Sequence, residues 1–314
     1  QRQMCIRDRY LCYSIVNEGK LDLLNNKEGF METSDFYGTE KVSRILLKIA
    51  PPVMLAQLIQ ALYNIVDSFF VGKYSETGLT ALSIIYPVQL LMIALGVGTG
   101  VGINTDMAYY LGIGKKKKAE EVAGTGTPLG LILWIIFAAV CYVTLPAYAG
   151  MSTDSPEVIR DVVAYGRIVC LFSIGLFTEG IWSKILQAEG DMRTPMIAQI
   201  AGAVVNIILD PLLIFGMLGM PEMGISGAAV ATVSGQIVAA LIVMKKAWYR
   251  SPRRSCYPGH IKRIYQLGIP NIIMQSAYTL YILGLNLILA GFSDQAVTLS
   301  LIHISEPTRP RLIS

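Results

Sequence analysis

Seven long apolar blocks, separated by short polar segments, constrain the fold of this chain more than any other feature of its sequence. The blocks cover approximately residues 45–71, 79–103, 129–149, 162–186, 196–218, 225–244 and 264–292. A block of about 20 apolar residues is long enough to cross a bilayer as a helix. Only 15% of the residues are charged, against about 25% in an average soluble protein. The sequence therefore predicts an all-α polytopic membrane protein.

Basic residues are concentrated in alternate segments between the blocks, which predicts the orientation. The other segments carry only Lys73, Arg160 and Arg167. Because Lys and Arg collect on the cytoplasmic side of a membrane, the amino terminus is predicted to be cytoplasmic. The polar stretch 153–157 predicts a helix start on the outer side. The basic segments carry Lys41, Arg44, Lys48, Lys115 to Lys118, Lys184, Arg193, Lys245, Lys246, Arg250, Arg253, Arg254, Lys262 and Arg263.

Both ends of the chain break the apolar pattern. Residues 1–30 and 300–314 resemble translated sequencing-adapter read-through, and they do not continue the pattern of the blocks beside them. We therefore expect a non-native leader before Met31 and a non-native tail after about residue 299, both without packed structure.

An internal repeat relates the first and seventh blocks, which match at a constant offset of 218 residues. Such a repeat predicts two six-helix halves about an axis along the membrane normal. Residues 31–250 would form the first lobe. Residues 251–299 would form a cytoplasmic linker and the first helix of a second lobe, with apolar surface left exposed. The alternative is chance matching between apolar helices. The matches are Pro52 with Pro270, Gln57 with Gln275 and Tyr63 with Tyr281.

Two acids, Asp67 and Asp210, lie inside apolar blocks, where an ionisable group costs about 3 kcal/mol. Each follows a proline by fifteen residues, so both are predicted about 22 Å along their helices. Asn206 shares a helix face with Asp210, and Thr232 is predicted at a similar depth. Two carboxylates, an amide and a hydroxyl suit a small hard cation, or the acids could hold a proton. Alternatively, each Asp could bond nearby backbone or cap a break at Pro211.

Weaker candidates lie in the same blocks. Glu179, with Gln57 and Tyr63, is a candidate lining of a cavity, and Glu179 could instead pair with Lys184. Asp106 lies nearer the cytoplasmic boundary and is expected to be solvated. Pro52 and Pro211 interrupt helical hydrogen bonding and are candidate hinges.

Several patterns point away from other functions. The glycine run 96–102 mimics a nucleotide fingerprint but lies inside an apolar block, so close helix packing is expected instead. The lysine run 115–118 is expected to be a solvated loop near lipid headgroups rather than a nucleic-acid site. The sequence contains no metal-ligand spacing, and no nucleophile lies near a base. We therefore expect neither an enzyme nor a bound metal or cofactor.

Segments in four places resemble the multidrug and toxic compound extrusion (MATE) family. They are residues 64–72, 186–195, 206–216 and 224–232, and the resemblance covers about 42–298. It implies a V-shaped pair of six-helix lobes in the bacterial inner membrane, monomeric when full length. It also implies export of organic cations or amphipathic drugs in exchange for Na⁺ or H⁺. The family's cation site carries over to Asp67, Asn206, Asp210 and Thr232.

The resemblance leaves two alternatives. One is a lipid-linked oligosaccharide flippase of the same superfamily, which would need a cationic cavity, whereas these blocks carry acids. The other is a non-transporting receptor or scaffold, which gives no reason for converging acids. Because five helices of the second lobe are absent, the chain as given is not expected to transport alone.

Overall fold

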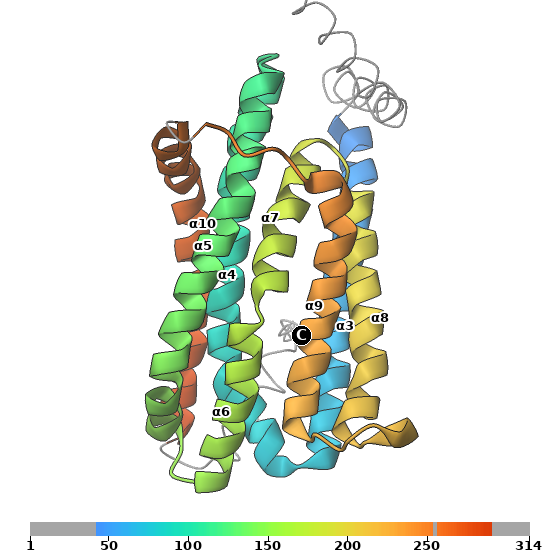
Figure 1. Ribbon diagram of the computed structural model, residues 1–314, viewed down its shortest axis with the longest axis vertical. Coiled ribbons are helices and arrows are strands. Elements are labelled where there is room, and N and C mark those ends of the chain that lie inside the picture. Colours follow the sequence, from blue (N-terminus) through green and yellow to red (C-terminus); the bar gives the residue numbers. More distant parts are fainter. Residues whose placement is uncertain (1–41, 254–255, 291–314) are drawn as a thin grey trace, which may run out of the picture. The chain divides into compact units, whose positions relative to one another are not determined.

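The computed structural model describes residues 42–253 and 256–290. Within these ranges its regular elements are helices, as the apolar blocks predict. Eight α-helices and one short 3-10 turn after α8 follow the order of the blocks in the described residues (Figure 1). In chain order the elements are α3 (Val42–Tyr74), α4 (Glu76–Gly112), α5 (Lys116–Ser152), α6 (Pro156–Leu171), α7 (Ile174–Ala188), α8 (Arg193–Ile214), η1 (Met217–Gly219), α9 (Ile225–Ala247) and α10 (Tyr257–Ala290).

The chain divides into two compact units, residues 1–52 and 53–314. In the first unit, the described part is the helical start of α3, which includes Pro51 and Pro52. The second unit contains the rest of α3 and all the other described helices. The expected non-native leader and tail both lie outside the described residues.

Among the described residues, five helices are long and apolar enough to cross a membrane: α3, α4, α5, α8 and α9. A sixth crossing is possible if the bent pair α6 and α7 acts as one span. The seventh expected span forms the long helix α10, but α10 is not among the helices that meet this condition. Polar residues such as Asn271, Gln275 and Ser276 interrupt its apolar sequence.

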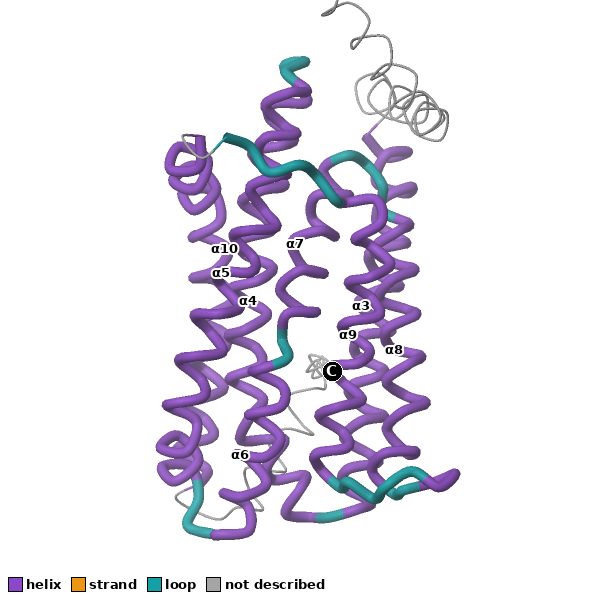
Figure 2. Tube along the Cα trace, in the orientation of Figure 1, coloured by secondary structure: helices purple, strands orange, loops and turns teal. Residues whose placement is uncertain are grey.

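The fourth expected span, 162–186, is long and apolar enough to cross a membrane, but it is bent rather than straight. It is two helices, α6 and α7, which meet at a bend of 46° (Figure 2). The bend frees backbone carbonyls, and side chains satisfy two of them. The Ser173 hydroxyl donates to the Cys170 carbonyl at 2.8 Å, and Trp134 Nε1 donates to the Leu171 carbonyl at 3.0 Å. These bonds stabilise a break that has no proline to mark it.

The helix starts follow local capping rules. Ser75 caps α4 by accepting a hydrogen bond from the Gly78 amide, and Glu76 follows it in the first turn. The predicted start near 153–157 is confirmed, because α6 begins at Pro156 with Glu157 in its first turn. The lysine run was expected to be a loop, but Lys116 already begins α5. The run is nevertheless exposed to solvent, as expected.

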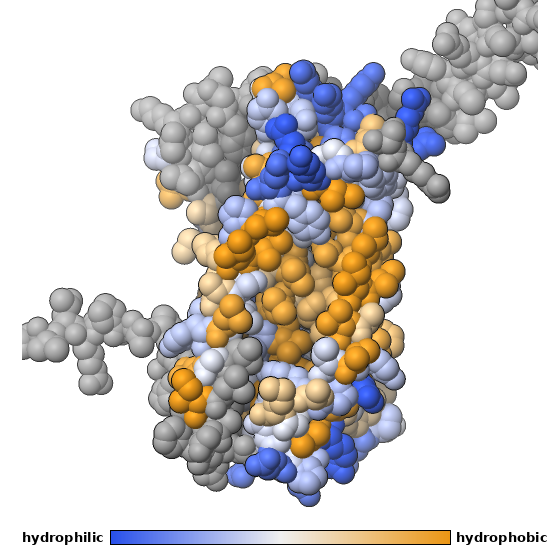
Figure 3. Space-filling view, turned by 90° about the vertical axis from the view of Figure 1, so that its left-hand side faces the viewer, coloured by the Kyte–Doolittle hydropathy of each residue, from blue (hydrophilic) through white to orange (hydrophobic). Residues whose placement is uncertain are grey.

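Helix contacts run in a sequence through the bundle: α8 packs on α9, α9 on α7, α7 on α4, and α4 on α10. Helix α6 joins this arrangement through contacts with α4, α5 and α9. Two apolar clusters fill the interior. We call the end where α4 and α9 finish and α5 and α10 begin the basic end, because Lys115 to Lys118, Lys245 and Lys246 lie there. Figure 3 shows hydrophobic side chains across the middle of one face and hydrophilic ones toward its ends.

Candidate functional site

Four polar residues from three helices come together inside the bundle, and these are the four predicted from the sequence. Asp67 lies on α3, Asn206 and Asp210 on α8, and Thr232 on α9. All four side chains are buried, and Asp210 is fully inaccessible. The spacing of four residues between Asn206 and Asp210 places both on one face of α8.

Asn206 joins the members of this site. Its Nδ2 lies 3.4 Å from both Asp210 Oδ1 and Thr232 Oγ1. Both distances are long for hydrogen bonds, which are usually 2.7–3.2 Å. Asp67 and Asp210 are close enough to interact electrostatically. Two carboxylates, an amide and a hydroxyl are therefore linked to one another inside the bundle by these contacts.

Three oxygen atoms of this site are buried without a hydrogen-bond partner: Asp67 Oδ1, Asn206 Oδ1 and Asp210 Oδ2. Buried polar atoms without partners are rare and costly. In the part of the chain that the structure describes, no lysine or arginine forms an ion pair with either acid. The donor set is oxygen only, which is the set that a hard cation such as Na⁺ prefers, and a carboxylate can also take up a proton.

Two glycines bring α8 and α9 close enough for Asn206 to reach Thr232. A Cβ added to Gly202 would lie 2.7 Å from the Gly235 carbonyl oxygen, and one added to Gly235 would lie 2.5 Å from the Gly202 carbonyl oxygen. The backbones therefore touch one turn away from Asn206. Sequence reasoning missed this pair, although small residues in apolar helices are a known signal of close packing.

Tyr165 on α6 also reaches the site and was missed. It is almost fully buried, it accepts a hydrogen bond from Gln89 Nε2 at 3.1 Å, and it interacts with Asp67 and Thr232. It therefore supplies a hydroxyl at the edge of the site. A tyrosine in an apolar span is too common to have been singled out from sequence.

Of the three candidate cavity residues, Tyr63 and Glu179 lie close enough to interact, whereas Gln57 does not point into the interior. Tyr63 is half-buried and interacts with Asp67, Asp210 and Glu179. Glu179 accepts a hydrogen bond from Ser183 at 2.6 Å, whereas the Lys184 ammonium bonds Gln187 at 2.9 Å. The described residues show no ion pair between Glu179 and Lys184, although the two charges interact electrostatically. Gln57 is exposed on α3.

The proposed hinge residues lie within continuous helices. Pro211 is inside α8, immediately after Asp210, and α8 continues to Ile214. Pro52 is inside α3, at the last residue of the first unit. The alternative of an Asp capping a break at Pro211 does not hold, because α8 is unbroken there.

Asp106 is fully buried, so the expectation that it is solvated was wrong. Its Oδ1 lies 2.5 Å from Arg263 Nε on α10. The helix α4 extends beyond its apolar block to Gly112, and α10 packs over this extension. This tertiary contact removes Asp106 from water.

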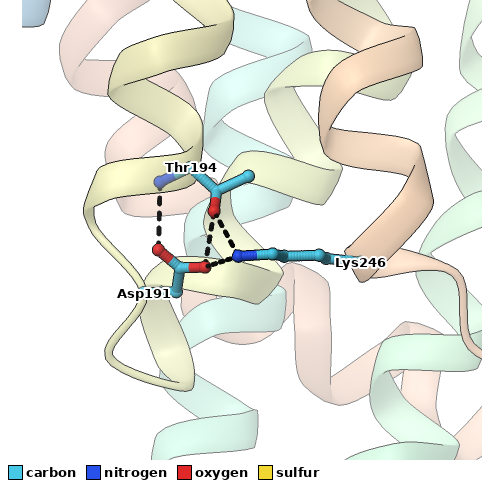
Figure 4. Close-up of polar contacts among 3 residues, drawn as sticks. All are labelled: Asp191, Thr194 and Lys246. Atoms are coloured by element: carbon cyan, nitrogen blue, oxygen red, sulfur yellow. Dashed lines mark hydrogen bonds and ion pairs between the residues drawn. The ribbon is translucent and has the colours of Figure 1, made fainter. Parts of the chain in front are cut away.

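The loop between α7 and α8 is held by a carboxylate that sequence reasoning did not single out. Asp191 accepts hydrogen bonds from the Thr194 amide and hydroxyl, and Lys246 on α9 also bonds Asp191 and Thr194 (Figure 4). Burial acts to raise the pKa of Asp191, but the bonds from Thr194 and Lys246 hold it below its ordinary value. Asp191 thereby joins the start of α8 to the end of α9.

An apolar pocket of about 300 Å³ lies between α5, α7 and α9, away from the four polar residues. It is lined by apolar side chains together with Thr127, Thr178, Trp182 and Trp248. The Trp182 ring donates a hydrogen bond to Thr127, which also lines the pocket. The lining of this pocket includes no carboxylate.

Comparison with known proteins identifies the family of this chain. The sequence profile of the MatE family matches residues 52–212, just over half of the chain. A probable multidrug resistance protein NorM from Thermotoga maritima is 28% identical over 74% of this chain and 52% of the relative. A FAD transporter from Shewanella oneidensis is 28% identical over 63% of this chain and 44% of the relative.

A solved structure is also similar. It is an inward-facing conformation of a multidrug resistance MATE family transporter of the MOP superfamily, with a TM-score of 0.70 and 26% identity. The match covers 81% of this chain and 59% of that structure. The chain spans about half the length of the curated relatives named above. With its apolar helices, it is a multi-pass membrane protein.

Proposed function

The chain belongs to the MatE family, and on that premise we propose that the whole protein is a secondary active antiporter. It exports small organic molecules, cationic or amphipathic, in exchange for Na⁺ or H⁺. Helices α3 to α9 form its first lobe, and α10 is the first helix of its second lobe. The protein lies in the bacterial inner membrane with its basic end in the cytoplasm, because Lys and Arg collect on that side.

The single observation that carries this proposal is the group Asp67, Asn206, Asp210 and Thr232. Two buried acids interact with each other, and an oxygen on each has no partner. A purely structural core would not place two acids together inside an apolar bundle, because burying unpaired charge is costly. A small mobile cation that enters and leaves gives these acids a function.

Coupling requires that the cation favour one conformation over another. A bound Na⁺, or a proton on one acid, neutralises charge and lets α3, α8 and α9 pack closely. When the cation leaves, the two acids repel each other and favour an arrangement in which water reaches them. Pro211 lacks a backbone donor directly beside Asp210, so α8 can bend there at lower cost than elsewhere.

We infer the substrate class from the charged residues inside the bundle rather than from the names of the relatives. One relative is named for multidrug resistance and the other for FAD, so their names differ in substrate. The membrane-spanning interior of this chain carries Asp67, Asp210 and Glu179, which favour organic cations. A strongly cationic cavity, as a flippase for anionic lipid-linked sugars would need, is not found among these residues.

The proposal is tested by efflux of a fluorescent organic cation from energised vesicles that contain the complete protein. Asp67→Asn and Asp210→Asn are expected to insert and fold but to lose ion-driven efflux. Glu179→Gln is the matched control, because it removes a nearby acid outside the four-residue group, and its effect should be milder. Expression and monodispersity are measured in parallel. Ion-driven efflux at the wild-type rate in Asp67→Asn would remove Asp67 from the mechanism and refute the site.

A further inference from the structure

Glycines bring several neighbouring helices of the bundle into backbone contact. A Cβ added to Gly102 of α4 would overlap the Ile264 carbonyl of α10, and one added to Gly100 would lie 3.0 Å from the Gly180 carbonyl oxygen of α7. The close packing expected for the glycine run 96–102 is therefore confirmed. Helices α5, α7 and α9 differ from these pairs, because the apolar pocket of about 300 Å³ lies between them.

The pocket lies between two backbone contacts. Near the middle of the bundle, a Cβ added to Gly175 of α7 would lie 2.9 Å from the Ile237 amide nitrogen of α9. At the basic end, the Arg250 carbonyl lies directly against Gly124 of α5. On the α9 side the lining runs from Ile237 to Trp248, which is about 16 Å of helix rise. The pocket is therefore long, and it extends from the middle of the bundle to the basic end.

One side of the pocket is open to the surroundings of the bundle. Leu241 and Trp248 on this side are 50% and 63% exposed, whereas Thr178 and Trp182 on the α7 side are 7% and 5% exposed. Leu241 lies in α9, which is apolar enough to cross a membrane. The opening along α9 therefore faces hydrocarbon rather than water, and the buried α7 side can be reached only through the pocket.

Two tryptophans line the pocket near its basic end. The ring centroids of Trp182 and Trp248 are 6.1 Å apart, within the usual range for a favourable aromatic pair. Trp182 donates its ring N–H to Thr127 Oγ1 at 2.9 Å, so the rest of its ring is apolar. Exposed tryptophans at the ends of membrane spans lie at the level of the lipid headgroups. Trp248 therefore places the basic end of the pocket at that level.

Two basic residues lie beside the pocket at this end. Lys245 is four residues after Leu241 and three before Trp248, so it shares their side of the helix. Arg250 follows Trp248 by two residues, and its backbone packs on Gly124 of α5. The chain after α9 crosses the basic end here on its way to α10 (Figure 1). Both basic residues thus lie close to the headgroup end of the pocket.

The charges of these two residues are available to a ligand. Lys245 and Arg250 are exposed. In the ranges that the structure describes, neither takes part in an ion pair, whereas the neighbouring Lys246 bonds Asp191. Glu120 on α5 is exposed at the same end, but the two bases outnumber it. Positive charge therefore prevails beside an apolar pocket.

We propose that this pocket binds one acyl chain of an anionic phospholipid, and that Lys245 and Arg250 hold the phosphate of its headgroup. The volume is at the lower end of the range for ligand pockets, and the lining has no carboxylate, so a single chain fits better than an organic cation. Basic residues beside spans favour anionic headgroups. The bound chain fills space between α7 and α9 that would otherwise lack packing partners. The inference does not rest on transport, because it concerns the lipid around the helices.

The test maps where lipid reaches the protein. The complete protein is placed in phosphatidylcholine nanodiscs with a trace of phosphatidylglycerol that carries a diazirine in one acyl chain. After illumination, adducts are located by mass spectrometry of peptides. Thr178 and Trp182 are expected to be labelled, because a chain reaches these buried positions only within the pocket. A phosphatidylcholine probe with the same chain should label them roughly fivefold less, since one basic residue near an anionic headgroup contributes about that factor.

A filled pocket should exclude the chain. Ala240 is a buried lining residue, and Ala240→Phe is expected to remove most adducts at Thr178 and Trp182. Ile136→Phe on α5 is the matched control, because Ile136 is exposed and lies outside the pocket. It should leave both adducts unchanged.

The headgroup contact is tested separately. Lys245→Gln and Arg250→Gln should each lower labelling by the phosphatidylglycerol probe roughly fivefold, and leave labelling by the phosphatidylcholine probe unchanged. Arg160→Gln removes an exposed charge at the opposite end of the bundle and should change neither.

Three results would overturn the inference. Adducts confined to exposed residues such as Leu241 would show that no chain enters the pocket. Equal labelling by the two probes would refute the anionic headgroup. Absent adducts together with a dimer on gel filtration would assign this surface to a second copy of the chain. The comparison of the two probes uses the unaltered protein, so it decides the question even where a variant fails to fold.

Discussion

Asp106 and the pair Asp67 and Asp210 are all buried acids in long apolar helices, but their surroundings differ. Asp106 has an arginine at 2.5 Å, and that arginine also stacks on two tyrosines. Asp67 and Asp210 interact with each other as like charges. Asp210 also lies beside Asn206, whose amide reaches Thr232. A fixed counter-charge suits an acid that holds helices together. An acid pair without a fixed counter-charge suits a site that binds and releases a cation.

The difference predicts opposite responses to mutation. At Asp106, removing the counter-charge of Arg263 should destabilise the protein, because an unpaired carboxylate is left behind. At the acid pair, removing one charge should relieve repulsion. Tests of stability can therefore separate the two sites without any transport assay.

The largest effect is expected from Gly102→Leu. A side chain here would overlap the Ile264 carbonyl of α10, and backbone cannot move aside as a flexible side chain can. We expect little monodisperse protein, measured by fluorescence-detected gel filtration. Gly112→Ala on the same helix is the control, because nothing lies within 4 Å of its added Cβ. Equal yields of both variants would show that α4 and α10 are not tightly packed at Gly102.

A smaller loss is expected from Arg263→Gln, on the order of 1–3 kcal/mol, because it strands the buried Asp106 carboxylate. Asp106→Asn should cost less, since the remaining arginine reaches water, and the double variant should be more stable than Arg263→Gln alone. Thermal unfolding in detergent measures all three. A double variant that merely sums the two single losses would contradict the pairing.

Asp67→Asn is expected to stabilise the substrate-free protein by an amount on the order of 1 kcal/mol, because one of two neighbouring buried charges is removed. The measurement is thermal unfolding in a choline medium above neutral pH, so that Na⁺ and protons do not mask the repulsion. Adding Na⁺ or lowering the pH should reduce the difference from wild type. A variant that is less stable than wild type would mean that Asp67 is a structural hydrogen-bonding group.

The smallest effect concerns Glu189, which follows α7 outside the spans. Burial first, and then the charges of Asp191 and Glu120, raise its pKa to about 7, although a hydrogen bond from Tyr249 opposes the rise. The folded protein thus holds a proton that the unfolded chain releases near pH 4.5, so stability falls as pH rises from about 4.5 through 7. Glu189→Gln should flatten that part of the profile of melting temperature against pH. The exposed Glu157→Gln should not, and an unchanged profile in Glu189→Gln would contradict the assignment.

Local geometry allowed the four residues to be grouped at one depth from the sequence, and their role in binding a cation stays a prediction. Helical rise sets the depth of Asp67 and Asp210 from their prolines, and a spacing of four places Asn206 beside Asp210. Depth alone brings residues on different helices to one level. It does not say which helices touch, and the glycines that bring α8 and α9 together were therefore missed.

Other features depend on packing that no local pattern records. Asp106 is buried by Arg263, which lies far away in sequence and reaches it only because α10 docks on α4. The bend between α6 and α7 has no proline, and it depends on bonds from Ser173 and Trp134 to freed carbonyls. Tyr165 reaches the four-residue group only because α6 packs against α9.

The claim that Asp67 and Asp210 hold the mobile cation, while Asp106 does not, is tested most directly by cation binding to the purified complete protein. Binding of radioactive Na⁺ and uptake of protons are measured for three proteins. They are wild type, the double variant that carries both Asp67→Asn and Asp210→Asn, and the single variant Asp106→Asn. We expect wild type and Asp106→Asn to bind the same cation to the same extent, and the Asp67→Asn, Asp210→Asn double variant to bind none. Binding at the wild-type level in that double variant would contradict the account.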